Sequence, residues 1–165
     1  MESSIILTNE QITNKTRRIA YQIYESNSNE KEIIIAGING NGYVFAQNLA
    51  EILSEISELK VALCEVKINK KNPRTEISTD IDSENYKNKS IVLVDDVLNS
   101  GSTLIYGIKF FLEVPLKRFK TAVLINRNHK KFPVKADFKG ISLSTSMHEH
   151  VSVIFEPNSS CAVLD

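Results

Sequence analysis

Two adjacent carboxylates followed by small polar residues carry the clearest chemical signal in the sequence. In IVLVDDVLNSGSTL, residues 91–104, Asp95 and Asp96 follow an apolar run, and four small residues then lead into a helix: Ser100, Gly101, Ser102 and Thr103. A glycine lets the backbone approach a ligand closely, and the free N–H groups of a first helical turn favour an anion, most often phosphate. The hydroxyl groups add further hydrogen bonds. We therefore predict a phosphate site at this turn.

The carboxylates need a different partner, because they would repel a phosphate. An ionised carboxylate only accepts hydrogen bonds, so sugar hydroxyls fit Asp95 and Asp96. A phosphate on one side and neighbouring hydroxyls on the other describe a ribose 5-phosphate, which is the ligand class that we predict. The alternative is a helix N-cap and a solvated turn. The stretch lacks the G-K-[ST] of a Walker A loop.

Strands that alternate with helices must position this site. Continuous apolar runs, such as SIVLV at 90–94, are typical of strands covered on both faces. The pattern predicts an α/β fold with a mainly parallel sheet, in which ligands bind beyond the carboxyl ends of the strands. We expect Asp95 and Asp96 at such an end. The expected strands are 32–37, 61–68, 90–94 and 120–126, with short extended pieces around 134–138, 141–143 and 151–155. The expected helices are 8–26, 41–56 and 103–113.

Composition indicates one domain over residues 1–165, with 42% hydrophobic and 24% charged residues. Lys plus Arg and Asp plus Glu are 20 each, so the net charge is zero and gives no global signal for nucleic acid or membrane. No window approaches the length of a membrane span, and MESSIILTNEQ does not resemble a signal peptide. Cys64 and Cys161 fit no zinc pattern, which favours a reduced, cytoplasmic protein.

The stretch VLVDDVLNSGST resembles the signature of type I phosphoribosyltransferases, with Ser100 in place of the usual threonine. Three more segments extend the similarity through most of residues 7–145: TNEQITNKTRRIAYQI, IIIAGINGNGYVFAQNLA and AVLINRNHKKFPVKADFKG. Together they are most similar to the pyrimidine-operon regulators that also act as uracil phosphoribosyltransferases. The resemblance implies a sheet flanked by helices, with a small C-terminal hood at about 126–150.

The resemblance also implies an activity. Such an enzyme transfers ribose 5-phosphate from phosphoribosyl pyrophosphate (PRPP), with Mg²⁺, to a nucleobase in nucleotide salvage, and uracil is the expected base. By resemblance, Asp95 and Asp96 hold the ribose hydroxyls, Asn99 joins them in the catalytic group, and residues 99–103 hold the 5-phosphate. The uncharged GINGNG loop supplies the expected pyrophosphate-binding residues Asn39, Gly40 and Asn41.

The expected base-binding residues lie in the hood. They are Asn126, Arg127, Phe138 and Lys139. Phe138 would cover one face of the base, although it can equally be ordinary core, and the Lys139 backbone would read the edge. Asn126 and Asn99 stand where the purine enzymes of the family carry a lysine and an aspartate, which argues against hypoxanthine and guanine. An amide donates and accepts, so Asn126 is compatible with uracil.

Several alternatives remain open from the sequence. The polar segment 69–89 resembles in position a flexible lid, whose Lys70, Lys71 and Arg74 would meet pyrophosphate, or it is a solvated loop or long hairpin. The second functional hypothesis is a nucleotide-sensing regulator that binds RNA, although the net charge does not support it. The third is a PRPP-binding homologue with weak catalysis. His148 and His150 flank Glu149 without a convincing metal pattern, so a metal site is not assigned. By resemblance we expect a homodimer or higher oligomer.

Overall fold

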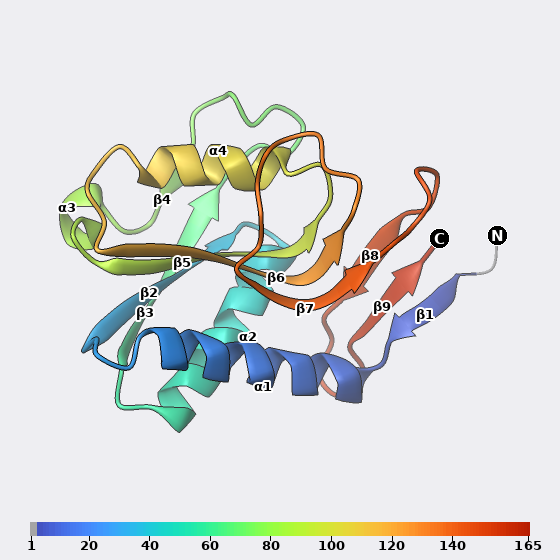
Figure 1. Cartoon of the computed structure of the whole chain (residues 1–165), viewed down its shortest axis with the longest axis horizontal. Helices are drawn as coiled ribbons and strands as arrows, with labels where there is room; N and C mark the ends of the chain where they lie inside the picture. The colour runs from blue at the N-terminus through green and yellow to red at the C-terminus, as the bar shows by residue number, and fades with distance from the viewer. Residues whose placement is uncertain (1–2) are drawn as a thin grey trace.

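The computed structural model describes residues 3–165, and its helices and strands alternate along the chain (Figure 1). In chain order the elements are β1 (Ser4–Leu7), α1 (Asn9–Ser26), β2 (Glu32–Ile38), α2 (Asn41–Ile56), β3 (Lys60–Lys67), β4 (Ser78–Thr79), α3 (Ser83–Tyr86), β5 (Ser90–Leu98), α4 (Ser102–Phe111), β6 (Arg118–Arg127), β7 (Phe138–Leu143), β8 (Val151–Ile154) and β9 (Cys161–Leu164). Within this part of the chain, no helix is both long enough and apolar enough to cross a membrane.

The central sheet has six strands in the order β4-β3-β2-β5-β6-β7, and every neighbouring pair except β3–β4 is parallel. Helices α1 and α2 cover one face, and α4 covers the other (Figure 1). Successive residues of β2 enter opposite cores: Ile33 and Ile35 face α1 and α2, whereas Ile34 and Ala36 face the side of α4. This alternation explains why the buried strands are apolar throughout. The predicted α/β fold is confirmed.

The N-terminus of α1 has a capping box. The Thr8 hydroxyl accepts a hydrogen bond from the backbone N–H of Gln11 at 3.3 Å, and the Gln11 side chain accepts from the Thr8 N–H at 2.9 Å. These two bonds satisfy N–H groups that have no partner inside the helix. The helix then buries Ile12, Ile19 and Ile23 against the central sheet.

The central strand β5 is longer than its apolar run predicted. It continues from Ser90 to Leu98, so Asp95 and Asp96 lie within the strand and not beyond its end. The neighbouring strand β6 supports the extension, because Asp95 pairs with Val123 and Leu98 pairs with Asn126. Carboxylates are poor strand formers, so the sequence pattern placed the end of the strand too early.

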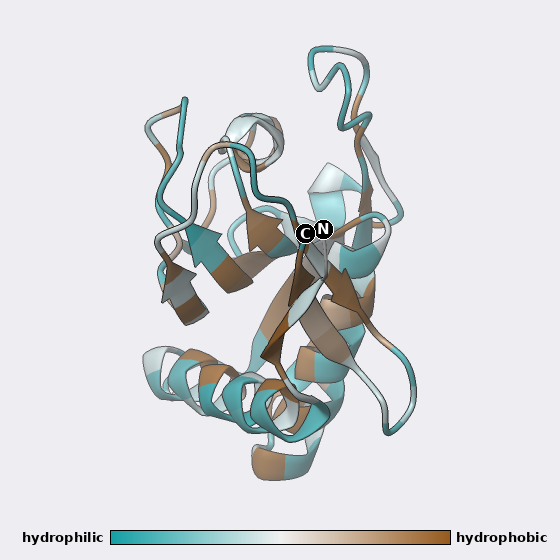
Figure 2. Ribbon diagram, turned by 90° about the vertical axis from the view of Figure 1, so that its right-hand side faces the viewer, coloured by the Kyte–Doolittle hydropathy of each residue, from teal (hydrophilic) through white to brown (hydrophobic). Residues whose placement is uncertain are grey.

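A second sheet covers the edge of the molecule and joins the two ends of the chain. Its antiparallel order is β1-β9-β8, with Ser4 opposite Leu164 and Val153 opposite Ala162 (Figure 1). Val153 and Ala162 belong to the same hydrophobic cluster as α1 and α2. In Figure 2 the strands are mostly apolar, whereas the loops that project from the molecule are mostly hydrophilic.

Residues 126–150, where the hood is expected, contain the end of β6, strand β7 and the segments around it. The structure assigns β7 to the central sheet, where it pairs parallel with β6, and the separate small sheet consists of β1, β8 and β9. The extended piece expected at 134–138 is wrong, because only Phe138 of that segment is in a strand. Between β3 and β5, the hairpin alternative for 69–89 is correct, since β4 pairs antiparallel with β3.

Candidate active site

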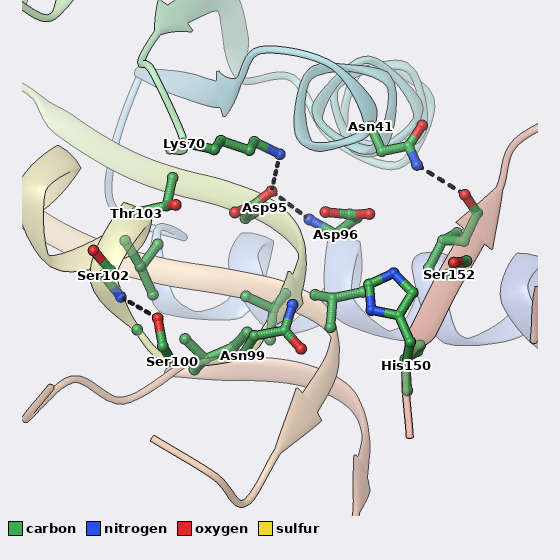
Figure 3. A pocket seen from close by; sticks show the side chains of 17 residues that line it. Asn41, Lys70, Asp95, Asp96, Asn99, Ser100, Ser102, Thr103, His150 and Ser152 are labelled. Atoms are coloured by element: carbon green, nitrogen blue, oxygen red, sulfur yellow. Dashed lines mark hydrogen bonds and ion pairs between the residues drawn. The ribbon is translucent and has the colours of Figure 1, made fainter. Parts of the chain in front are cut away.

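A cavity of about 370 Å³ opens where β5, the β5–α4 turn, the start of α2, the β3–β4 segment and β8 converge (Figure 3). Its wall contains the acid pair and the small-residue turn that the sequence singled out. The polar residues that line it are Asn41, Lys70, Asp95, Asp96, Asn99, Ser100, Ser102, Thr103, His150 and Ser152. Segments that are more than 100 residues apart in the sequence thus share one site.

Asp95 is the most deeply buried acid of this cavity. Its side chain is 8% exposed, and its Oδ1 atom accepts a hydrogen bond from the Asp96 N–H at 2.9 Å. Gly42 of α2 packs directly against it, because a Cβ atom at residue 42 would lie 2.7 Å from Oδ1. Burial, and then the nearby charge of Asp96, raise the pKa of Asp95 to about 8, although Lys70 opposes the shift. Burial therefore makes the ionised form of Asp95 less favourable than it is in water.

The turn between β5 and α4 has the backbone that its glycine predicts. Gly101 is the N-cap of α4, with φ of +87° in the left-handed region that glycine tolerates best. The Ser100 hydroxyl accepts a hydrogen bond from the Ser102 N–H at 3.2 Å. The Ser100 backbone carbonyl accepts from the backbone N–H groups of Lys131 at 2.8 Å and Phe132 at 3.1 Å. These bonds fix the loop before α4, and the first residues of the helix line the cavity. The free N–H groups of a first helical turn can bind an anion.

The predicted pyrophosphate loop presents one of its three residues to the cavity. Asn41 lines the cavity, and its Nδ2 donates to the Val153 carbonyl at 2.8 Å, which ties α2 to the small sheet. Asn39 is instead held at the end of β3, because its Oδ1 accepts from the Ile68 N–H at 3.0 Å. Gly40 has φ of +86° and caps α2. These three residues are uncharged. The positive charge in the cavity wall comes from Lys70, which is the lysine that lines it.

The four predicted base-binding residues lie outside the cavity wall. Phe138 packs partly buried against the core, and the Lys139 carbonyl accepts hydrogen bonds from the Arg18 guanidinium at 3.3 Å. Asn126 donates from Nδ2 to the Ser142 hydroxyl at 3.2 Å. Arg127 is buried, and its guanidinium contacts Asn99 and the segment 145–149. None of these four residues lines the cavity, and their contact with a base stays a prediction.

The cavity wall opposite the β5–α4 turn comes from residues that the sequence analysis did not assign to the base. It consists of His150, Val151, Ser152 and Val153, at the start of β8 (Figure 3). From the sequence alone, the only role that His150 suggests is that of a metal ligand. The signal that was available is the apolar alternation of 151–155, which predicted a strand but not its position beside the cavity.

The H-E-H sequence at 148–150 does not form a metal site. Within residues 3–165, no three His, Cys, Asp or Glu side chains group closely enough to hold an ion. Glu149 instead accepts a hydrogen bond from the Ser146 N–H, which lowers the pKa of its carboxyl group. Of the residues 148–150, only His150 lines the cavity.

Comparison with known proteins decides the family. Residues 2–157 match the model of the phosphoribosyl transferase domain. The chain belongs to the phosphoribosyltransferase family. Two similar relatives are proteins named bifunctional protein PyrR, from Clostridium beijerinckii (32% identical, 93% of this chain and 91% of the relative) and Clostridium novyi (33% identical, 92% and 89%). The resemblance to that branch of the phosphoribosyltransferases is thus confirmed.

Solved phosphoribosyltransferase structures share the fold. The hypoxanthine phosphoribosyltransferase of Trypanosoma cruzi superposes with a TM-score of 0.79 at 16% identity, over 96% of this chain and 95% of that one. A hypoxanthine-guanine phosphoribosyltransferase of Bacillus anthracis has a TM-score of 0.72 at 21% identity, over 87% and 85%. These likenesses confirm the type I phosphoribosyltransferase fold and say nothing of the base that this chain uses.

Proposed function

We propose that this protein transfers ribose 5-phosphate from PRPP to a pyrimidine base, with uracil as the leading candidate, and releases pyrophosphate. The observation that carries the proposal is the acid pair and the small-residue turn in the wall of one cavity. The relatives named bifunctional protein PyrR favour the same class of reaction. The bond between C1 of the ribose and a pyrophosphate oxygen breaks, a ring nitrogen of the base bonds to C1, and that nitrogen loses its proton.

The ribose 5-phosphate lies along β5 and the start of α4. The phosphate binds the N–H groups and hydroxyls of residues 100–103, where the helix N-terminus favours negative charge. The ribose hydroxyls contact Asp95 and Asp96. Positive charge develops on the ribose ring as the pyrophosphate leaves, and the ionised carboxylate of Asp96 stabilises it.

The pyrophosphate lies on the side of Lys70 and Asn41. Lys70 lies 3.8 Å from Asp95 and is 45% exposed, so it can turn from the acid to an incoming anion. Mg²⁺ prefers oxygen ligands and commonly binds through a few carboxylates together with substrate phosphates. Two neighbouring carboxylates fit this mode, with Asp95 and Asp96 beside an ion that PRPP carries into the site. The ion would neutralise charge on the leaving pyrophosphate.

The base lies between the β5–α4 turn and the wall formed by residues 150–153. Phe138 and Lys139 do not line this cavity, and their contacts with the base stay a prediction. A purine enzyme of this family would carry a lysine at residue 126 and an aspartate at residue 99, and this chain has asparagine at both positions. The absence of both purine-specific groups supports a pyrimidine.

The RNA-binding alternative gains no support from the basic residues of α1, which are Lys15, Arg17 and Arg18. Arg18 donates from Nη2 to the Gly140 carbonyl at 2.7 Å as well as to Lys139, so its guanidinium serves the contact between α1 and β7. Arg17 stacks over the Tyr21 ring, 5.5 Å from its centre. A phosphoribosyltransferase therefore remains the function that the site supports best.

A base panel tests the proposal. Purified protein is incubated with PRPP, Mg²⁺ and one base at a time (uracil, hypoxanthine, guanine, xanthine or orotate), and nucleotide and pyrophosphate are both quantified. We expect stoichiometric UMP and pyrophosphate from uracil. Turnover of purines alone would reject the pyrimidine assignment. PRPP binding without product from any base would reject catalysis and support the homologue with weak activity.

A further inference from the structure

Arg127 lies directly behind the cavity wall and contacts a residue that lines it. Its Nη1 donates to the Asn99 Oδ1 at 3.0 Å. The rest of the guanidinium is fixed from the other side, since Nε and Nη2 donate to the Thr145 hydroxyl at 3.0 and 2.7 Å, and Nη2 donates to the Glu149 carbonyl at 2.8 Å. Arg127 is 8% exposed, so its guanidinium is buried and held by several hydrogen bonds, whereas Asn99 is exposed at the end of this partly buried network.

The contact determines which way the Asn99 amide faces. A guanidinium has only donors, so the Asn99 atom that meets it must be the carbonyl oxygen. This removes the usual ambiguity between the oxygen and nitrogen of a side-chain amide. The Nδ2 group is then the part of Asn99 left to the cavity, and Figure 3 shows it on the side of the acid pair. The wall of the cavity therefore presents a hydrogen-bond donor at residue 99.

We propose that Arg127 positions Asn99 as a donor that selects bases with an oxo group beside the reacting nitrogen. This inference rests on the proposed function and deepens it. A 2-oxopyrimidine that reacts through N1 has the C2 carbonyl next to that nitrogen, and this oxygen accepts from Asn99. A purine that reacts through N9 with its hydrogen at N7 would instead direct a donor toward a donor. Sites that hydrogen-bond their substrate discriminate strongly against partners that leave a polar group unpaired.

The substitution Asn99→Asp tests the role of the amide. The shape is retained and Arg127 keeps its partner, but the group that faces the cavity becomes an acceptor. Because the new charge also repels phosphate, dissociation constants are measured by calorimetry for both UMP and ribose 5-phosphate. We expect the dissociation constant of UMP to rise about tenfold more than that of ribose 5-phosphate. A tenfold difference corresponds to the loss of one hydrogen bond. The ratio of kcat/KM for uracil over hypoxanthine falls in the same variant.

The matched control is Asn128→Asp. Asn128 is exposed, lies outside the cavity wall, and accepts one hydrogen bond from the Thr145 N–H at 3.4 Å that a carboxylate retains. It adds the same charge near the site, and we expect equal, small changes for UMP and ribose 5-phosphate. If Asn99→Asp also weakens the two ligands equally, and leaves the base ratio unchanged, Asn99 does not read the base and the inference is overturned.

Arg127→Gln tests the positioning role. The Asn99 amide becomes free to rotate, so the preference for UMP over ribose 5-phosphate should fall while ribose 5-phosphate still binds, which shows that the site is folded. An unchanged preference would overturn the positioning role. Should this variant fail to fold, Asn99→Asp still decides whether the Asn99 amide reads the base. The outcomes also separate the two proposals: a wild-type protein without turnover, but with a UMP preference that Asn99→Asp removes, would reject the enzyme and retain the selective donor.

Discussion

The Nζ atom of Lys70 lies 3.8 Å from the Oδ1 atom of Asp95, so a side chain of the segment between β3 and β4 reaches the acid pair of β5. Lys70 is 45% exposed, whereas Asp95 is 8% exposed. The buried acid is therefore fixed and the lysine is the adjustable member of the pair. Since the loop at 39–41 is uncharged, we propose that Lys70 provides positive charge to a bound pyrophosphate.

Lys70→Gln should raise the KM for PRPP roughly tenfold, which corresponds to ~1.4 kcal/mol. The KM for the base should change much less, because Lys70 lies on the pyrophosphate side of the cavity. Steady-state kinetics with each substrate varied in turn measure both constants. Lys71→Gln is the matched control, because Lys71 is exposed and does not line the cavity. Equal effects of the two substitutions would mean that Lys70 contributes only to the overall charge of the segment.

Asp95→Asn should stabilise the fold increasingly as the pH rises. Burial raises the pKa of Asp95 from 3.8 to about 8, so the folded protein holds this proton more tightly than the unfolded chain does. The resulting stabilisation of the wild type is complete below pH 3.8 and is lost as the pH rises through about 8. Asparagine does not titrate and avoids this loss. The Tm of the variant should therefore exceed that of the wild type more at pH 9 than at pH 5.

Thermal unfolding of both proteins in the same buffers gives this comparison. For a chain of this size, a Tm difference of about 2–4 °C corresponds to ~1 kcal/mol. The control is Asp82→Asn, at an exposed aspartate whose side chain makes no capping hydrogen bond. A difference between Asp95→Asn and the wild type that stays constant with pH, or grows toward low pH, would contradict a raised pKa.

The residues proposed to bind ribose and phosphate can be found from the sequence because they are neighbours in the chain. Asp95, Asp96 and the turn at 99–103 are close in the chain. The glycine at residue 101 indicates a tight turn, and its backbone is indeed in the left-handed region. Asp95 and Asp96 could also be placed near a sheet edge, although the pairing with β6 extends the strand past them. That extension depends on a neighbouring strand, so the apolar run of β5 alone does not contain it.

The residues on the proposed base side of the cavity could not be predicted in the same way. Arg127 is the last residue of strand β6, and its hydrogen-bond partners Asn99 and Thr145 lie 28 residues before it and 18 residues after it in the chain. Strands β1 and β9 have four residues each and pair the two ends of the chain, so neither carries a recognisable local pattern. Side-chain contacts over such separations depend on the folded topology and not on residue type.

Asp96→Asn should remove PRPP-dependent turnover without destabilising the fold. Asp96 is half-buried in the cavity wall, and its backbone N–H, which the substitution retains, makes the hydrogen bond to Asp95. Loss of the charge that stabilises the transition state should lower kcat/KM by roughly 100-fold or more. Product formation is measured together with the Tm. A large fall in the Tm would instead mean that the acid pair serves the fold and not the reaction.

Gly101→Ala should destabilise the protein more than Gly40→Ala. Both glycines have a left-handed φ, of +87° and +86°, so each substitution costs about 1–3 kcal/mol in backbone strain. A Cβ atom at residue 101 would additionally lie 2.5 Å from the Val134 Cγ1, whereas none of the surrounding atoms lies within 4 Å of one at residue 40. Adding Val134→Ala should recover part of the free energy of unfolding lost in Gly101→Ala, as measured by urea denaturation. Equal losses for the two glycine variants would show that Val134 moves aside and that only the strain remains.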